Sequence, residues 1–319
     1  MKHLFIVNPA AGGQDCTAQV RAAAEQVFSR RSAAGEGYEI YTTRAPLDAP
    51  GKIRYEAGLV NALRVYACGG DGTLNECVCG AAGLENTAVT HYPTGTGNDF
   101  VKTFGADSGR FRDLAGLVEG EERRLDLIDC NGRRCLNICS VGVDARIGVD
   151  VHKYSSIPLI GGATGYVTST VVNLARGVNR PLRVICCGRL YHGDMALVCA
   201  CNGSYYGGGF HPVPEARPDD GLLDFLIVRG VSRLRFLRLV THYAKGEYAD
   251  YPDEITHVRG DSMDIESERT LVVNVDGEAI HARHVHIRLL PGALRFVVPA
   301  GMGSPEGNGE KREASPQIV

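Results

Sequence analysis

The chain has 319 residues and a formal net charge of −3; 44% of its residues are hydrophobic and 22% are charged. This composition is typical of a soluble globular protein, and the length suits two domains. The sequence pI near 6.4 gives no reason to expect a nucleic-acid partner. Apolar runs fall short of the roughly 20 residues of a membrane-spanning helix, and the first run is too short for a signal peptide.

Eleven cysteines occur in the chain, an odd number with no Cys-x-x-Cys pair. Cys199 and Cys201 alternate through the apolar run "ALVCAC", so we expect most cysteines to behave as small core hydrophobes. Cys77 and Cys79 lie two residues apart on a predicted helix and point in different directions, which disfavours a metal site. The cysteines therefore predict reduced thiols and a cytoplasmic location.

The first part of the chain alternates short apolar runs with helical patterns. Helices are predicted over 18–28 and 73–83, and strands over 2–7, 38–43, 63–68 and 87–93. Strands that are separated by helices form parallel sheets through crossover connections. We expect an α/β domain over 1–124, with a parallel sheet flanked by helices.

From Leu125 onward, apolar strands follow one another through Gly, Asp and Asn turns, a pattern typical of a mostly antiparallel β-sandwich. The predicted strands are 125–130, 133–143, 181–188, 195–203, 222–229, 269–278, 284–292 and 293–300. Two helix-like insertions, 164–177 and 232–246, interrupt them. We expect this domain to span 125–300 and the polar tail 301–319 to be disordered.

Three glycine-rich loops follow strands of the predicted parallel sheet: "NPAAGG", "GGDGT" and "PTGTGNDF". The carboxyl ends of parallel strands form the ligand-binding edge of such a sheet. Glycines let backbone N–H groups approach a phosphate, and a following helix adds its positive N-terminal end. Any one loop is equally well a tight turn, but three on one edge indicate a phosphate-binding site.

Asp71 and Asp99 lie inside two of these loops, where an unpaired carboxylate would repel a phosphate. A magnesium ion between the carboxylates and the phosphates would remove the repulsion. Asp99 also suits a helix N-cap, and the two roles are compatible. The chain has neither a GxxxxGK[ST] motif nor the HRD and DFG motifs, which excludes P-loop enzymes and protein kinases.

Six segments occur in the order seen in one known family: "NPAAG", "GGDGTLNE", "PTGTGNDF", "NICSVGVDA", "GGGFHPVPEARPDDGLLD" and "VDGE". The chain resembles the diacylglycerol kinase catalytic-domain superfamily over nearly its whole length, up to about residue 300. It resembles the bacterial soluble lipid kinases in particular, with sphingosine and ceramide kinases as more distant relatives. The resemblance implies an NAD kinase-like first domain and a lipid-binding second domain.

The resemblance also implies binding sites. The ATP site would be lined by Asn8, Pro9, Ala10, Ala11, Gly12, Thr43, Gly70, Asp71, Gly72, Thr73, Leu74, Asn75, Glu76 and Thr96. A structural magnesium ion would be held by Asp220 and the carbonyls of Arg217 and Leu222. Many relatives carry a Lys soon after the first motif, and this chain does not; Lys102 either compensates or is a solvated helix residue.

The family's catalytic acid pair lies in the "DGE" turn, so Asp276 and Glu278 are candidates for the base. Asp71 is a rival, because relatives differ over which acid takes the proton. The same residues also suit a hairpin turn with Asp-Gly at its centre. We favour both roles together for this segment.

These features predict a lipid kinase that uses ATP and Mg²⁺, most simply to convert diacylglycerol to phosphatidic acid. Phosphatidylglycerol, ceramide or a sphingoid base remain alternative substrates. NAD kinases share "GGDGT", but the "PTGTGNDF" loop and the "PDDG" segment argue against that activity. A third hypothesis is a catalytically silent lipid-binding or regulatory protein. We expect the protein to meet its lipid peripherally, at the inner membrane surface, and family resemblance suggests a homodimer.

Overall fold

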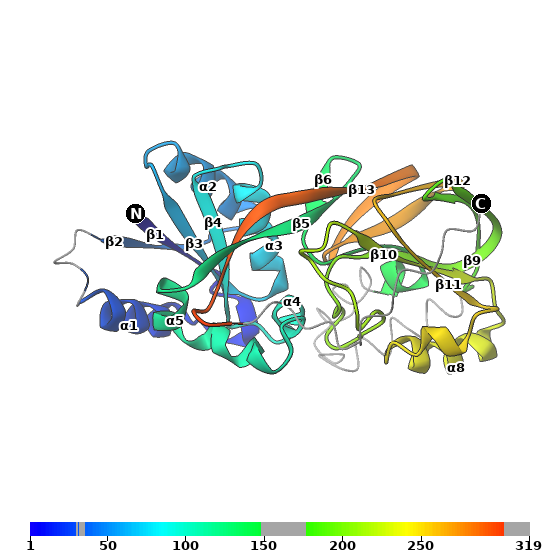
Figure 1. The fold of residues 1–319 in the computed structure, drawn as a ribbon, viewed down its shortest axis with the longest axis horizontal. Helices are drawn as coiled ribbons and strands as arrows, with labels where there is room; N and C mark the ends of the chain where they lie inside the picture. Colours follow the sequence, from blue (N-terminus) through cyan, green and yellow to red (C-terminus); the bar gives the residue numbers. More distant parts are fainter. Residues whose placement is uncertain (30, 32–35, 148–176, 303–319) are drawn as a thin grey trace.

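The computed structural model describes residues 1–29, 31, 36–147 and 177–302, and Figure 1 shows two domains side by side. In the N-terminal domain, parallel strands follow the order β4-β3-β1-β2. Its strands are β1 (Lys2–Val7), β2 (Gly37–Thr42), β3 (Leu63–Gly69) and β4 (Thr87–Pro93). Its helices are α1 (Thr17–Phe28), α2 (Asp48–Ala57), α3 (Asp71–Ala81), α4 (Asp99–Lys102) and α5 (Leu114–Val118), with 3₁₀ turns η1 (Ala11–Gly13) and η3 (Gly105–Arg112).

Burial explains why these segments form this sheet. Every residue of β3 and β4 is buried, as expected for central parallel strands that are covered on both faces. The helix α1 buries Val20, Ala24 and Phe28, which recur at helical spacing along one face. Phe5 of β1 stacks on Tyr66 of β3 with ring centroids 4.3 Å apart. The predicted α/β domain is therefore present.

The helix α2 was not predicted, because Pro50 and Gly51 ordinarily interrupt helices. Here the helix begins at Asp48, so Pro50 lies in its first turn, where its missing N–H has no intrahelical partner to lose. Leu47 enters the helix with a left-handed φ of 65°. Sequence pattern alone gives little sign of such a start.

The C-terminal domain is mostly antiparallel, as predicted, with the strand order β11-β10-β9-β7-β12-β13. The strand β8 pairs with β9 and β12, and β5 pairs with β6 and β13. The elements are β5 (Glu121–Cys130), β6 (Arg133–Cys135), β7 (Ile138–Gly142), β8 (Arg180–Cys186), β9 (Arg189–Cys201), β10 (Leu223–Arg229), α8 (Arg233–Tyr243), η4 (Tyr248–Asp250), β11 (Ile255–Gly260), β12 (Ser262–Val275) and β13 (Glu278–Val298).

The strands of this domain differ from prediction in number at three places, and β9 and β12 begin at Arg189 and Ser262 rather than at 195 and 269. The strand β11 was missed, and the predicted strand 133–143 is two short strands. The last two predicted strands are one continuous strand, β13, whose pairing with β5 shifts register between Leu290 and Leu294. Pro291 and Gly292, which predicted a turn, lie instead at this break in the strand pairing. Most of the insertion 164–177 and the tail from 303 lie outside the described residues.

The long strand β13 joins the two domains. It runs from the C-terminal domain to the N-terminal sheet (Figure 1), where Phe296 pairs in parallel with Val89 of β4. The Thr90 hydroxyl donates to the Val297 carbonyl at 2.7 Å. The ring of Phe296 also packs against Phe100, at 5.5 Å between centroids. The two domains therefore share backbone pairing and core packing.

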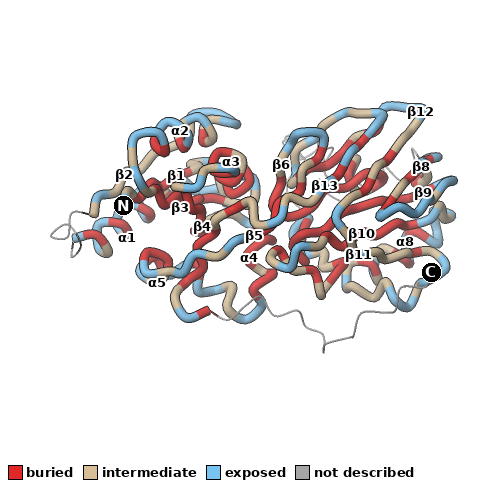
Figure 2. Tube along the Cα trace, turned by 45° about the horizontal axis from the view of Figure 1, so that its top comes forward, coloured by how far each residue is buried: buried red, intermediate tan, exposed pale blue. Residues whose placement is uncertain are grey.

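The middle strands of the C-terminal domain consist mostly of buried residues (Figure 2). On β10, Phe225 and Ile227 join one hydrophobic cluster, whereas Leu226 and Val228 join another, which also contains residues of α8. This alternation follows the two-residue period of a strand. All eleven cysteines are free thiols and nine are buried, in agreement with the core role predicted for most of them. Within the described residues, no helix is long and apolar enough to cross a membrane.

Candidate active site

The three glycine-rich loops meet at the carboxyl edge of the N-terminal sheet. The carbonyl of Gly69 accepts the N–H groups of Thr94 and Gly95, at 3.0 and 3.1 Å. A Cβ on Gly95 would overlap the backbone of Gly70, and one on Gly12 would overlap the carbonyl of Thr94. Glycine is required at these positions because the loops approach so closely. The edge therefore has three backbone loops in contact, as a phosphate cradle requires.

The residues predicted for ATP binding are distributed along this edge. The Asn8 amide donates to the Thr73 hydroxyl at 3.1 Å, which ties the first loop to the second. Thr43 follows β2 and donates its N–H to the carbonyl of Val7. The side chain of Leu74 belongs to the hydrophobic core, and Glu76 accepts the N–H of Leu47. The predicted nucleotide roles of these residues stay predictions.

Asp71 and Asp99 share one space beside Gly97. A Cβ on Gly97 would lie 3.0 Å from Oδ2 of Asp71 and 3.8 Å from Oδ2 of Asp99. Asp71 begins α3, and its Oδ1 accepts the N–H of Phe100 at 3.2 Å. Burial, and then the charge of Asp99, raise the pKa of Asp71. The two carboxylates therefore face the same space beside Gly97, and Asp71 lies near enough to Asp99 to be affected by its charge.

Asp99 has partners of its own. It is the first residue of α4, whose N-cap is Asn98, so the alternative role of Asp99 as an N-cap is wrong. Its Oδ1 accepts from the Lys102 ammonium at 2.6 Å, and its Oδ2 accepts from the Gly208 N–H at 2.6 Å. Lys102 is thus bound to the site rather than being only a solvated helix residue.

Asp276 lies in the turn between β12 and β13. Asp276 and Gly277 both have positive φ, 48° and 93°, as a two-residue Asp-Gly hairpin requires. The Asp276 carboxylate accepts the backbone N–H groups of Leu136, Asn137 and Ile138 at 2.7 to 3.2 Å. The predicted hairpin is therefore present, and its acid is fixed against the start of β7.

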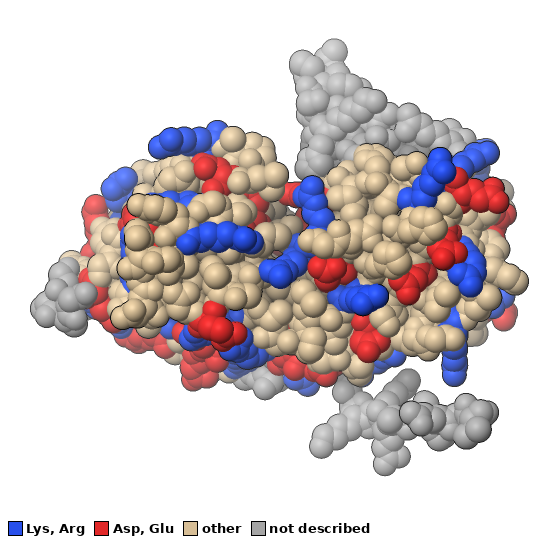
Figure 3. Space-filling view, turned by 90° about the horizontal axis from the view of Figure 1, so that it is seen from above, with Lys and Arg blue, Asp and Glu red and all other residues tan. Residues whose placement is uncertain are grey.

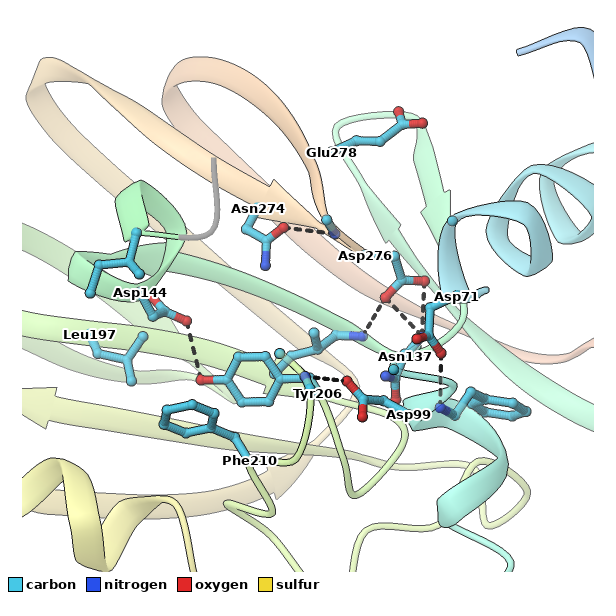
Figure 4. Close-up of a pocket in the computed structure, with 18 of the residues that line it drawn as sticks. Asp71, Asp99, Asn137, Asp144, Leu197, Tyr206, Phe210, Asn274, Asp276 and Glu278 are labelled. Atoms are coloured by element: carbon cyan, nitrogen blue, oxygen red, sulfur yellow. Dashed lines mark hydrogen bonds between the residues drawn. The ribbon is translucent and has the colours of Figure 1, made fainter. Parts of the chain in front are cut away.

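Burial raises the pKa of Asp276 to about 6; the backbone N–H groups oppose this shift, and the charge of Asp71 adds to it. Figure 4 shows Asp276 and Asp71 facing the same space, whereas the Glu278 carboxylate points away from them. Glu278 instead pairs with Arg133 at 3.2 Å, with side chains 42% and 53% exposed. The "DGE" acids therefore do not converge: only Asp276 faces Asp71.

A single cavity of about 790 Å³ extends from these acids into the C-terminal domain. Asp71, Asp99 and Asp276 line one part, where the two domains meet. Apolar side chains from β9, β10, α8 and the loop after β9 line much of the rest: Leu197, Phe210, Val228, Phe236, Leu239 and Val240. Figure 4 shows Leu197 and Phe210 among them. The cavity thus joins a charged end to an apolar end, as expected for an amphiphilic ligand.

Two family models match the chain. The diacylglycerol kinase catalytic domain matches residues 2–130, and the YegS C-terminal NAD kinase beta sandwich-like domain matches residues 137–298. The chain is also 30% identical over 294 residues to the "Probable lipid kinase YegS-like" of Pseudomonas aeruginosa, covering 91% of this chain and 93% of that protein. The chain belongs to the YegS-like lipid kinase family.

Further members of this lipid kinase family agree with the match. The "Probable lipid kinase YegS-like" of Chromohalobacter salexigens is 30% identical over 78% of this chain and 80% of its own. A crystal structure described as a diacylglycerol kinase from Bacillus anthracis is 25% identical, with a TM-score of 0.67 over 95% of this chain and 98% of that one. A second structure from that organism is 28% identical, with a TM-score of 0.72 and the same coverage.

The cavity also contains a polar cluster that sequence reasoning missed. The Tyr206 hydroxyl donates to Asp144 at 3.4 Å and lies 3.1 Å from the hydroxyl of Tyr243. Burial raises the pKa of Asp144 to about 6. Asp144 lies in the quoted segment "NICSVGVDA", but an acid that follows an apolar strand gives no sign of partners more than 60 residues away.

The "PDDG" loop contains the acid predicted to bind a structural magnesium ion. Asp220 pairs with Arg259, and Arg217 pairs with Asp219 at 3.1 Å. Nearby Asp224 is buried, and its Oδ2 has no hydrogen-bond partner among the described residues. No group of three His, Cys, Asp or Glu side chains in the described parts of the chain is arranged to hold a metal. A cation here would therefore need carbonyl oxygens as well.

Proposed function

We propose that the protein transfers the γ-phosphate of ATP to the hydroxyl of a membrane lipid, with diacylglycerol as the substrate and phosphatidic acid as the product. One observation carries the proposal: a single cavity joins the acids at the glycine-rich loops to an apolar interior. An amphiphile bound there would have its hydroxyl at the charged end and its acyl chains among Leu197, Phe236 and Leu239.

ATP would bind at the loop edge, where backbone N–H groups and the N-terminus of α3 favour phosphate. Asp71 and Asp99 fit a magnesium ion, because their Oδ2 atoms flank the same side of Gly97 and carboxylate oxygens are preferred ligands. When bound, magnesium would neutralise charge on the phosphates during transfer. Lys102 would hold Asp99 in place and supply a positive charge that the first loop lacks.

Asp276 is the group best placed to take the proton of the lipid hydroxyl. Its carboxylate is fixed by three backbone N–H groups and lines the cavity, facing the same space as Asp71. A pKa of about 6 leaves it ionised at neutral pH yet basic enough to accept a proton. Asp71, the other candidate for the base, would instead be a ligand of the magnesium ion.

The "PDDG" loop would hold a second, structural magnesium ion. The buried Asp224 oxygen without a partner and the neighbouring Asp220 supply hard oxygen donors. Carbonyls of Arg217 and Leu222 would complete the set. Because Arg259 already pairs with Asp220, the ion would have to share this carboxylate with the guanidinium.

A transfer assay tests the proposed function. Radiolabelled ATP, magnesium and the purified chain are incubated with diacylglycerol, phosphatidylglycerol, ceramide or sphingosine in mixed micelles, and with NAD in a parallel reaction. The proposal expects label on diacylglycerol and none on NAD. If only another lipid is labelled, that lipid replaces diacylglycerol as the proposed substrate. If only NAD is labelled, the proposal of a lipid kinase is overturned.

A further inference from the structure

The helix α8 (Arg233–Tyr243) has two different faces. Phe236, Leu239 and Tyr243 are at most 7% exposed, and all three line the cavity. On the other side, Leu234 is 78% exposed and Leu237 47% exposed. The helix forms because its apolar residues recur at helical spacing and are buried on the inner face. The Ser232 side chain also caps its N-terminus. Among the residues that the structure describes, none covers these outer leucines.

Basic side chains surround the exposed leucines. The helix carries three arginines, Arg233, Arg235 and Arg238, and no acidic residue, and Lys245 follows it on the surface. Arg235 pairs with Glu254. Arg238, next to Leu237 and one turn from Leu234, has no side-chain hydrogen bond or ion pair within the described residues. We define the outer face of α8 as Leu234, Leu237, Arg238 and Thr241, which recur at helical spacing.

The surface on the side away from α8 carries charges of both signs. Figure 3 views the molecule from above, away from α8, and shows acidic and basic side chains interspersed over both domains. The chain as a whole carries a formal net charge of −3. The segment after α8 carries Glu247, Asp250, Asp253 and Glu254, and two of these acids pair with Arg235 and His242 of the helix. The positive charge that the outer face itself presents is therefore that of Arg238, beside the two exposed leucines, and this charge would favour an anionic surface.

We infer that the outer face of α8 docks on the surface of an anionic phospholipid bilayer. Exposed leucines flanked by arginines are the pattern of a helix that lies in the membrane interface. Arginines are attracted to anionic headgroups, and leucines leave water for the acyl boundary. The inference rests on the proposed function, because it takes the bilayer to be the source of the lipid substrate.

The position of α8 would place the bilayer next to the cavity. Its inner face forms a wall of the cavity and its outer face would lie in the bilayer, so only the width of the helix would separate the membrane from the cavity. Figure 1 shows α8 at the edge of the C-terminal domain, outside its strands. A lipid that leaves the bilayer beside α8 would reach the apolar end of the cavity without crossing open water.

Vesicle sedimentation tests the inference. The full chain is mixed with vesicles of phosphatidylcholine alone, or of phosphatidylcholine containing phosphatidylglycerol, and the bound fraction is measured. We expect binding to the anionic vesicles that weakens with added salt. A Leu234→Ser, Leu237→Ser, Arg238→Ala variant should bind at least about tenfold more weakly. A matched control, Leu190→Ser with Arg189→Ala, changes an exposed leucine and arginine on β9 and should bind like the parent.

The outcomes separate the inference from the proposed function. Equal vesicle binding by the α8 variant and the parent overturns the inference, even if diacylglycerol is phosphorylated. Loss of binding in the α8 variant supports it, even if no lipid is phosphorylated. Light scattering is measured in parallel: a change of oligomeric state in the variant with unchanged vesicle binding would assign the face to a contact between copies, and would also overturn the inference.

Discussion

The backbone N–H of Gly208 donates a hydrogen bond of 2.6 Å to Oδ2 of Asp99. Gly208 belongs to the loop after β9 in the C-terminal domain, and Asp99 begins α4 at the edge of the N-terminal sheet. The carboxylate that we place beside the phosphates is therefore also a contact between the domains. Because an Asn oxygen can keep this hydrogen bond, Asp99→Asn removes the charge of Asp99 with little change to the contact.

The Asp99→Asn variant identifies the base. Asp99 raises the pKa of Asp71, so removing its charge lowers that pKa, whereas the main influences on the pKa of Asp276 are burial, its backbone hydrogen bonds and the charge of Asp71. If Asp276 takes the proton, the residual kcat/KM of the variant should still fall below about pH 6, as in the parent. Measurement of kcat/KM against pH decides this. An acid limb that moves to lower pH in the variant would assign the proton to Asp71.

Asp71→Asn should abolish turnover and leave the fold intact. The Asn oxygen can still accept the N–H of Phe100, so local structure is kept, but the carboxylate facing Asp99 loses its charge. A loss on the order of a thousandfold is expected for one group at a centre where charge develops. Steady-state assays with circular dichroism as a fold control measure it. Turnover within a few-fold of the parent would remove Asp71 from the site.

The sequence predicted the α/β order, the mostly antiparallel second domain and the meeting of three loops, because strand periodicity and glycine punctuation are local signals. It did not predict that β13 pairs with β4, since pairing between residues 89 and 296 leaves no local pattern. It placed Asp276 and Glu278 together as a pair, although the turn directs their side chains apart. The cluster of Asp144, Tyr206 and Tyr243 was missed for the same reason, because only the fold brings these residues together.

Asp144→Asn should stabilise the protein at alkaline pH. Burial raises the pKa of Asp144 to about 6, above the value of about 3.9 for an unfolded chain. The folded state then binds the proton more tightly, so Asp144 lowers the free energy of unfolding as pH rises from about 4 through about 6. A pKa difference of about 2 corresponds to about 3 kcal/mol as an upper value.

Thermal melts of parent and Asp144→Asn across this pH range measure the effect. The gain in melting temperature should be largest above about pH 7 and should vanish near about pH 4, where Asp144 is protonated in both states. Asp253→Asn, at an exposed acid of the same domain, is the matched control and should change little. A variant that is less stable than the parent at every pH would contradict the buried-charge argument.

Asp220→Ala should remove a magnesium-dependent increase in stability. A cation that binds only the folded chain raises the free energy of unfolding by mass action, about 2.7 kcal/mol at a hundred times its Kd. Without nucleotide, the parent should melt at a higher temperature in magnesium than in EDTA, and Asp220→Ala should melt at the same temperature in both.

Asp71→Asn is the matched control, because it removes an acid from the nucleotide edge and leaves Asp220 and Asp224 in place. Its melting temperature should therefore still rise with magnesium. If parent and Asp220→Ala respond equally, or neither responds, the "PDDG" loop holds no magnesium, and Arg259 alone balances Asp220.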